Sequence, residues 1–316
     1  MQALLNASEE IRICPETRFM DKVMKPYYRY PAGVGKSKSS RILRKYVTAH
    51  AFADSGINPE NYLARMREIS LHDTHGLAVL LTEFSKKHQA TRVGEKTPGH
   101  LYIAHRLLQE FPKSAVVAMV RDPRAVYASI RKTNFNPYGL SLFIPRWKMD
   151  FYLVQALKQL HPTRVLPVYY EDLVESPVVT MRKVTDFIGI TFSDEMLRPA
   201  ARHLEGIDFQ REPWKANVAN PITSDSKSRW KNELSPAQVS RIEYWCHAEI
   251  SASRGALRET PPTSPKDSWF LLTAVLSAAL ELKWKLSRCP WKREVVAMLV
   301  AESAARSGEA NHCIGR

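Results

Sequence analysis

The chain has 316 residues, of which 44% are hydrophobic and 25% are charged, an ordinary globular composition that allows one large α/β domain with additional helices. Its formal net charge of +14 predicts a surface that attracts polyanions, whether nucleic acid, anionic lipid or a small ligand carrying several phosphates. The four cysteines are widely spaced and include no Cys-x-x-Cys pair, so they indicate neither a zinc site nor a disulfide framework.

The amino end shows no recognisable signal peptide, because Met1-Gln-Ala-Leu-Leu reads as part of a helix. Far along the chain, the longest apolar stretch, Trp269 to Leu280, is shorter than the roughly 20 residues that a membrane span needs. Basic side chains follow it. Residues 269–293 therefore predict either a peripheral membrane contact or, as the favoured alternative, a helix packed on the main domain.

The first half of the chain alternates between short apolar runs and helical patterns. A helix ending near Ser8 precedes a strand at 11–13, and the basic polar stretch from Lys22 to Arg44 predicts a surface loop. The elements expected next are helices at 59–69 and 76–87, a strand at 91–94, a turn at 96–98 and a helix at 101–111.

The second half continues the alternation. The apolar run 114–120 suits a strand buried on both faces. A helix follows it, and the further expected elements are a helix at 142–160, a strand at 164–170 and a helix at 178–188. Strands that alternate with helices predict a parallel sheet with right-handed crossovers.

Past this α/β pattern, the polar segment 206–229 has no periodicity, which is typical of a functional loop or of disorder. Ser235-Pro236 then caps a helix that runs to about Ile250. We therefore expect an α/β domain over residues 1–255, a Pro-rich linker over 256–267 and a helical extension over 268–316.

A candidate anion grip follows the buried strand. Arg121 stands at the carboxyl end of that strand, where ligands bind in doubly wound α/β folds, and Ser129 lies on the next helix. Together they suit one phosphate. An equally good interpretation pairs Arg121 with Asp122 and bonds Ser129 back into its own helix.

Two further charged residues follow strands and so belong to the same sheet edge. Glu16 suits a general base, although a lone glutamate is more often an acidic residue in the first turn of a helix. Lys96 suits neutralisation of charge on a leaving group. Alternatively, Lys96 pairs with Glu95 or with helix-capping groups.

Aromatic and basic residues complete the set. Tyr170 closes the strand expected at 164–170, where it either stacks on a base or donates its hydroxyl to a phosphate, or else packs in the core. The segment Lys227-Ser-Arg229-Trp230-Lys231 provides cations and an aromatic ring that suit closure over a nucleotide, or is an ordinary solvated loop.

Taken in order, these motifs resemble the sulfotransferase family that uses 3′-phosphoadenosine 5′-phosphosulfate (PAPS). The resemblance spans roughly Met1 to Ile250, and the segment Ile13-Cys-Pro-Glu16-Thr-Arg18 is most similar to the tyrosylprotein branch. It implies a P-loop-nucleotide-hydrolase-like parallel sheet with helices on both faces.

The resemblance also implies roles for individual residues. Glu16 would deprotonate the acceptor hydroxyl, Lys96 would stabilise the oxygen that bridges sulfur and phosphorus, and Arg18 would border the acceptor site. Four residues would bind the cofactor, mainly through its 3′-phosphate: Arg121, Ser129, Tyr170 and Arg229. No metal is expected.

Two departures from the family pattern stand out. In secreted members of the tyrosylprotein branch, a disulfide joins two cysteines at the positions of Ile13 and Gly94. The absence of both cysteines from this chain argues for a reduced, cytoplasmic protein. The family also opens with a strand and a glycine-rich loop that cradles the 5′-phosphosulfate, whereas Met1-Gln-Ala-Leu-Leu matches the helix after that loop. We therefore expect the first strand and loop to be missing from this chain.

The expected activity is transfer of a sulfuryl group from PAPS to a hydroxyl acceptor, which is a peptide tyrosine, a sugar or a small alcohol. The alternative is a catalytically inactive relative that binds the nucleotide and serves as a sensor or scaffold. Nucleic-acid binding ranks last, because the sequence contains no recognised RNA- or DNA-binding module. A homodimer is a further expectation.

Overall fold

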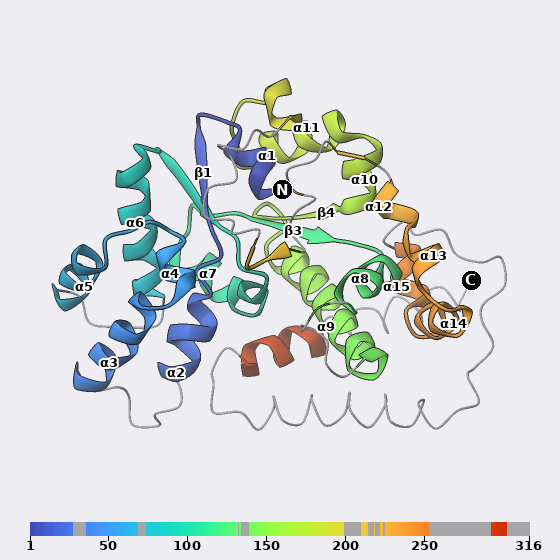
Figure 1. Cartoon of the computed structure of the whole chain (residues 1–316), viewed down its shortest axis with the longest axis horizontal. Helices are drawn as coiled ribbons and strands as arrows, with labels where there is room; N and C mark the ends of the chain where they lie inside the picture. Colours follow the sequence, from blue (N-terminus) through green and yellow to red (C-terminus); the bar gives the residue numbers. More distant parts are fainter. Residues whose placement is uncertain are drawn as a thin grey trace. The chain divides into compact units, whose positions relative to one another are not determined.

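In the part of the chain that the structure describes, two pairs of parallel strands form the sheets (Figure 1). The computed structural model describes residues 1–27, 36–68, 74–131, 133, 139–198, 210–213, 218, 222–223, 225–252 and 292–301. The chain divides into two compact units. The first contains Met1–Ser114 with Arg182–Pro221, and the second contains Ala115–Met181 with Ile222–Arg316.

In the first unit, β1 (Ile11–Cys14) pairs in parallel with β2 (Arg92–Glu95). Ile11 lies opposite Arg92 and Cys14 lies opposite Glu95, so both strands end at the same level. The short helix α1 (Gln2–Asn6) is tied to β1, because the Asn6 side chain accepts the backbone N–H of Ile13 at 2.7 Å.

Helices cover most of the remainder of this unit, and an aromatic cluster fills its core. The rings of Phe19, Tyr46, Phe52 and Tyr62 meet at centroid distances of 5.1 to 6.2 Å, mostly edge to face. The helices are η1 (Met20–Met24), α2 (Lys25–Tyr27), α3 (Lys36–Val47), α4 (His50–Ala53), α5 (Pro59–Glu68), α6 (His75–His88), η2 (Pro98–Ile103), α7 (Ala104–Glu110) and η3 (Asp194–Leu197).

The predicted surface loop from Lys22 to Arg44 is wrong over its described parts. Residues up to Tyr27 belong to η1 and α2, and residues from Lys36 belong to α3. In α3 the buried side chains of Ser39, Leu43 and Tyr46 recur at helical spacing. The lysines and arginines between them hide this short apolar stripe in the sequence.

In the second unit, β3 (Val116–Val120) pairs in parallel with β4 (Val165–Tyr169), with Val116 opposite Val165. The predicted cap at Ser235 is confirmed, since Ser235 and Gln238 form a reciprocal capping box. The helices are α8 (Pro123–Ile130), α9 (Gly139–Leu160), α10 (Tyr170–Glu175), α12 (Asp225–Ser228), α13 (Trp230–Glu233), α14 (Pro236–Trp245), α15 (His247–Ala252) and the helical residues 292–301. Helix α11 (Pro177–Ile188) contains the boundary between the units.

Strand β3 is less buried than its sequence predicts. Val116, Val117 and Ala118 are only half-buried, and Met119 is 41% exposed. Among the described residues β3 has β4 as its neighbour on one side only, so it is an edge strand of this pair. The expectation of a strand buried on both faces is therefore wrong for β3, whereas β4 is largely buried.

The α/β class with parallel strands is confirmed, as are the predicted helices near residues 59–69, 76–87 and 178–188. The boundary predicted after residue 255, the linker 256–267 and the apolar stretch 269–280 lie outside the described residues. None of the helices in the described part of the chain is both long and apolar enough to cross a bilayer.

Candidate functional site

Glu16 and Lys96 form an ion pair in the first unit. Each follows one strand of the β1–β2 pair, and the parallel register brings both to the carboxyl end of these strands. Both side chains are partly exposed, at 25% for Glu16 and 37% for Lys96, so a substrate can reach them. Glu16 and Lys96 therefore share one sheet edge as expected, whereas Arg121, which was expected at the same edge, follows β3 of the other strand pair.

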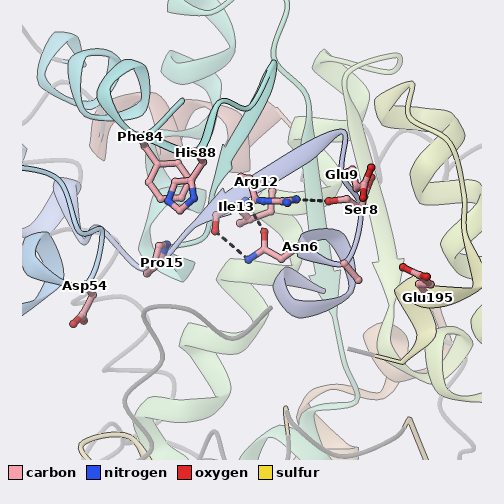
Figure 2. A pocket seen from close by; sticks show the side chains of 11 residues that line it. Asn6, Ser8, Glu9, Arg12, Ile13, Pro15, Asp54, Phe84, His88 and Glu195 are labelled. Atoms are coloured by element: carbon pink, nitrogen blue, oxygen red, sulfur yellow. Dashed lines mark hydrogen bonds between the residues drawn. The ribbon is translucent and has the colours of Figure 1, made fainter. Parts of the chain in front are cut away.

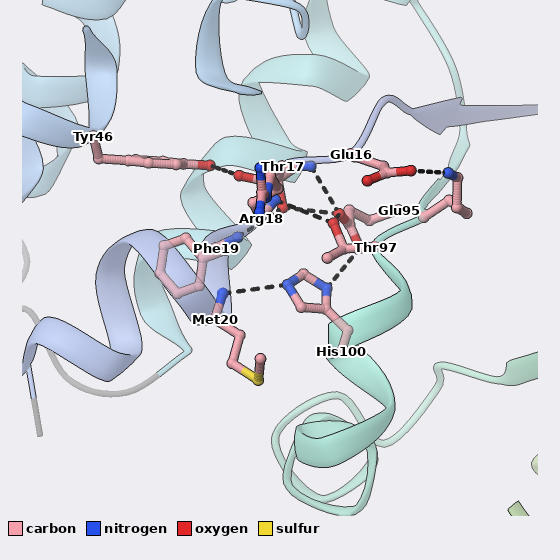
Figure 3. Close-up of polar contacts among 10 residues, drawn as sticks. Glu16, Thr17, Arg18, Phe19, Met20, Tyr46, Glu95, Thr97 and His100 are labelled. Carbon is pink, nitrogen blue, oxygen red and sulfur yellow. Dashed lines mark hydrogen bonds and ion pairs between the residues drawn. The ribbon is translucent and has the colours of Figure 1, made fainter. Parts of the chain in front are cut away.

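Glu95 has partners other than Lys96. Its Oε1 accepts the N–H of Thr17 at 3.0 Å, the hydroxyl of Thr17 at 2.8 Å and the hydroxyl of Thr97 (Figure 3). Its Oε2 accepts a hydrogen bond from Nδ1 of His100 at 2.6 Å. Burial by itself raises the pKa of Glu95, but His100 and the hydrogen bonds from Thr97 and Thr17 outweigh burial, so the pKa is lowered.

Arg18 has an unusual backbone. Its φ of 50° places it in the left-handed region, its side chain is exposed, and its N–H donates to Oγ1 of Thr97 at 3.1 Å. The preceding carbonyl, that of Thr17, accepts a bond from the Tyr46 hydroxyl at 3.1 Å. The exposed Arg18 side chain therefore projects from a backbone that is fixed on both sides.

Arg121 and Tyr170 are in contact in the second unit. The guanidinium carbon of Arg121 lies 4.1 Å from the ring centroid of Tyr170, the first residue of α10. Burial lowers the pKa of Arg121, Tyr170 and Glu171 oppose this effect, and the charge of Arg229 lowers the pKa further. The structure thus shows the Arg121 guanidinium beside an aromatic ring that carries a hydroxyl group.

Asp122 holds Arg124. It caps α8 by accepting the N–H of Arg124 at 2.8 Å, and its carboxylate also binds the Arg124 guanidinium at 2.6 to 3.1 Å. One of the helix N–H groups expected for a phosphate is therefore taken by Asp122. Glu243 binds the same guanidinium at 2.6 Å. Burial lowers the pKa of Arg124, but the bonds to Asp122 and Glu243 outweigh burial and the net pKa is raised.

Trp230 covers the buried Arg124, with 4.2 Å between the ring centroid and the guanidinium carbon. The ring is therefore stacked on α8, and the expected closure of Trp230 over a nucleotide stays a prediction. The preceding residue, Arg229, is 45% exposed and binds Glu233 at 2.8 Å. Nothing in the sequence distinguishes Arg124 from a surface arginine, so sequence reasoning missed it.

Ser129 lies in the last turn of α8 and is half-buried. The site residues thus form two groups. Glu16, Lys96 and Arg18 belong to the first unit, and Arg121, Ser129, Tyr170 and Arg229 belong to the second. The roles assigned to these seven residues stay predictions.

A separate cavity of about 400 Å³ opens in the first unit (Figure 2). Polar and charged side chains line it, including Asn6, Arg12 and His88, and neither Glu16 nor Lys96 belongs to its lining. Arg12 binds the backbone carbonyls of Ser8 and Ile11, so its guanidinium is already engaged by the chain. The described ranges contain no group of His, Cys, Asp and Glu side chains that could hold a metal ion.

Comparison with known proteins points to one family. A model of the Sulfotransferase family matches residues 1–194. The protein-tyrosine sulfotransferase of Drosophila melanogaster is 24% identical over 278 residues, which cover 84% of this chain and 50% of that protein. Protein-tyrosine sulfotransferase 2 of Gallus gallus is 26% identical over 245 residues, which cover 73% of this chain and 59% of that protein. The chain thus spans about half the length of these curated relatives.

Solved structures agree on the fold. The sulfotransferase domain from the curacin biosynthetic pathway matches with a TM-score of 0.50 and 16% identity, covering 81% of this chain and 93% of that domain. The sulfotransferase domain of the Synechococcus PCC 7002 olefin synthase matches with a TM-score of 0.50 and 18% identity, covering 88% of both chains.

Proposed function

Because the family model matches well over half of its length, the chain belongs to the sulfotransferase family, and we propose that it transfers a sulfuryl group from PAPS to a hydroxyl acceptor. The observation that carries this proposal is the pairing of Glu16 with Lys96 at the carboxyl end of neighbouring parallel strands. A carboxylate and an ammonium side by side suit a reaction that removes a proton from one oxygen and neutralises charge on another.

In the proposed reaction the acceptor hydroxyl oxygen attacks the sulfur atom of PAPS while Glu16 takes the hydroxyl proton. The bond between sulfur and the bridging oxygen breaks as the new bond forms, and Lys96 stabilises the negative charge on that oxygen. The products are a sulfate ester and adenosine 3′,5′-bisphosphate. As in phosphoryl transfer, positioning and charge neutralisation supply most of the rate.

The nucleotide is assigned to the second unit's residues. Arg121 binds the 3′-phosphate through its guanidinium, with Ser129 and Tyr170 contributing hydroxyl groups and Arg229 a second cation. Support comes from the contact of Arg121 with Tyr170, in which 4.1 Å separate the guanidinium carbon from the ring centroid, so that a cation and a hydroxyl-bearing ring lie side by side. No metal takes part in the proposed reaction.

The preferred acceptor is a tyrosine flanked by acidic residues in a peptide. Proteins named protein-tyrosine sulfotransferase are among the relatives. Exposed cations near the Glu16 turn would attract acidic neighbours of such a tyrosine. They are Arg18 and Lys22. A glycan and a small alcohol are the other acceptors to assay, and a homodimer and a cytoplasmic location stay predictions.

The test is a transfer assay with radiolabelled PAPS and a panel of acidic tyrosine peptides, glycans and small alcohols. The chain is assayed both as given and with any codons that precede Met1 in frame. Glu16→Gln is expected to lower kcat by about 100-fold or more, as for loss of a general base, while affinity for adenosine 3′,5′-bisphosphate survives. Glu110→Gln changes an exposed carboxylate on α7 and serves as the control.

The outcomes separate the two functions. Sulfuryl transfer that requires Glu16 supports the enzyme, and unchanged turnover in Glu16→Gln refutes the role of this residue. Binding of adenosine 3′,5′-bisphosphate without transfer to any acceptor would instead support the sensor or scaffold. Arg121→Met is expected to weaken nucleotide binding by about 10- to 100-fold, because a charge-assisted hydrogen bond is lost.

A further inference from the structure

Glu95 connects the two turns that carry the proposed catalytic pair. We propose that Glu95 is a positioning residue, which holds the turn bearing Glu16 against the turn bearing Lys96 without touching the substrate. This inference rests on the proposed function, because it gives Glu95 its importance for turnover. The bonds themselves are independent of that function.

The connection is direct, since one carboxylate oxygen binds the neighbours of both catalytic residues. Oε1 of Glu95 accepts two bonds from Thr17, which follows Glu16, and one from Thr97, which follows Lys96. Glu95 is itself the residue before Lys96. A change at Oε1 therefore acts on the backbone on either side of the ion pair.

A second bond crosses between the same two turns. The hydroxyl of Thr97 donates to Glu95 and accepts the N–H of Arg18 at 3.1 Å, so it is used in both directions. The hydroxyl of Thr17 likewise donates to Glu95 and accepts the N–H of Phe19 at 3.3 Å. These bonds stabilise the left-handed conformation of Arg18, which residues other than glycine adopt only rarely.

His100 adds a further set of hydrogen bonds to those of Glu95 with Thr17 and Thr97. Its Nδ1 binds Oε2 of Glu95 at 2.6 Å, and its Nε2 faces the N–H of Met20 at 3.4 Å (Figure 3). Nδ1 therefore carries the proton and Nε2 accepts. Since Met20 begins η1, the same carboxylate also fixes, through His100, the helix into which the Glu16 turn leads.

Both side-chain oxygens of Glu95 are surrounded by hydrogen-bond donors, so this position requires a group with two acceptor atoms. The N–H and hydroxyl of Thr17, the hydroxyl of Thr97 and Nδ1–H of His100 all point protons at Glu95. An amide in place of the carboxylate turns one acceptor into a donor, which then faces a donor. The side chain is also 7% exposed, so water cannot easily compensate for a lost bond.

The kinetic test compares Glu95→Gln, Thr97→Val and Thr97→Ser with the parent protein. We expect kcat to fall by about 100-fold in Glu95→Gln, as for a misplaced catalytic group. Thr97→Val, which removes the hydroxyl at nearly constant shape, should lower kcat by about 10-fold, whereas Thr97→Ser retains the hydroxyl and most of the activity. KM for PAPS and affinity for adenosine 3′,5′-bisphosphate should stay within about two-fold in all three variants, because ground-state binding is not altered.

A parent-like kcat in folded Glu95→Gln and Thr97→Val would overturn the inference. So would an equal loss in Thr97→Ser and Thr97→Val, because one of them keeps the hydroxyl. If Glu95→Gln fails to fold, the Thr97 pair decides the matter alone.

Amide hydrogen exchange tests the bonds without using activity. We expect the amides of Thr17 and Arg18 to exchange at least about 10-fold faster in Glu95→Gln, because each loses or loosens its acceptor, while amides of α6 are unchanged. Unchanged protection at Thr17 and Arg18 would overturn the inference. A parent protein that transfers no sulfuryl group, but whose Thr17 and Arg18 amides respond in this way, would refute the proposed function and leave the anchoring role of Glu95 standing.

Discussion

The guanidinium of Arg124 lies 4.2 Å from the ring centroid of Trp230, so the first residue of α13 is stacked on the first turn of α8. Arg124 cannot move to accommodate the ring, because it is 2% exposed and bound by Asp122 and Glu243. The Trp230 ring thus packs on a buried guanidinium group whose position is fixed by two carboxylates. We expect the position of the preceding residue, Arg229, to depend on this contact.

This relationship predicts a graded response at Trp230. Trp230→Leu should weaken binding of adenosine 3′,5′-bisphosphate by roughly five- to ten-fold and lower the free energy of unfolding by about 1 kcal/mol, since a desolvated cation–π contact is lost. Trp230→Phe retains an aromatic ring and should keep most of the nucleotide affinity and most of the unfolding free energy. Titration calorimetry and urea denaturation measure the two effects. Gln159→Ala, which changes an exposed residue near the end of α9, is the control. Nucleotide binding that is equal in the leucine and parent proteins would contradict the expected effect of Trp230 on the position of Arg229.

A second prediction concerns Glu171, whose pKa is raised, first by burial and further by Asp122, against the lowering effects of the backbone N–H of Asp122 and of Arg121. The side chain is 3% exposed, and its Oε2 has no hydrogen-bond partner within the described part of the protein. A raised pKa means that the folded protein holds the proton more tightly than the unfolded chain does. Stability from Glu171 is therefore complete below the unfolded value of 4.5 and is lost as the pH rises through the folded pKa.

Glu171→Gln should accordingly gain stability relative to the parent as the pH is raised from 4 to 7, by about 1.4 kcal/mol for each unit of the shift. The amide oxygen can still accept the N–H of Asp122, which Oε1 accepts at 3.0 Å. Urea denaturation at several pH values measures the difference. A difference in unfolding free energy that is the same at every pH would show that Glu171 has an ordinary pKa in the folded protein.

The third prediction concerns the contact between Ile13 and Gly94, which face each other in the β1–β2 register. A Cβ added at Gly94 would lie 2.5 Å from Cδ1 of Ile13, so Gly94→Ala should cost about 1 to 3 kcal/mol through overpacking. Ile13→Val removes that methyl group and by itself should cost about 0.5 to 1.5 kcal/mol.

The double variant Ile13→Val/Gly94→Ala should therefore lose less unfolding free energy than the sum of the losses in the two single variants. A double-mutant cycle by thermal or urea denaturation measures this coupling. Strictly additive effects would mean that Ile13 moves aside without cost. Ile13 and Gly94 also occupy the positions at which the secreted tyrosylprotein branch is expected to carry a disulfide, and here they are neighbours in the β1–β2 pair.

Much of the fold follows from local patterns in the sequence. The short apolar runs at β1, β3 and β4 and the helical spacing of α5 and α6 depend on neighbours within a few residues, so they can be read directly. Helix α3 could not, because its narrow apolar stripe lies among five lysines and arginines. The exposure of β3 depends on which strand lies beside it, which no local pattern contains.

The candidate site was predictable where strand order alone decides it. Parallel strands end at one edge, and this places Glu16 with Lys96 whatever their other neighbours are. Glu95 and Arg124 could not be found in this way. Both are charged residues that the fold buries, and the partners that make burial tolerable, such as Thr17 for Glu95 and Glu243 for Arg124, come from distant parts of the chain.

The positive φ of Arg18 limits what this position can tolerate. Glycine would relax the backbone but remove the cation, and lysine would keep the cation with the backbone still strained. Valine, isoleucine and threonine would clash with the main chain, because branching at Cβ is hardly compatible with the left-handed region. A substitution scan of codon 18 should consequently be tolerated by very few residue types, and the intolerance would reflect backbone shape as much as lost charge.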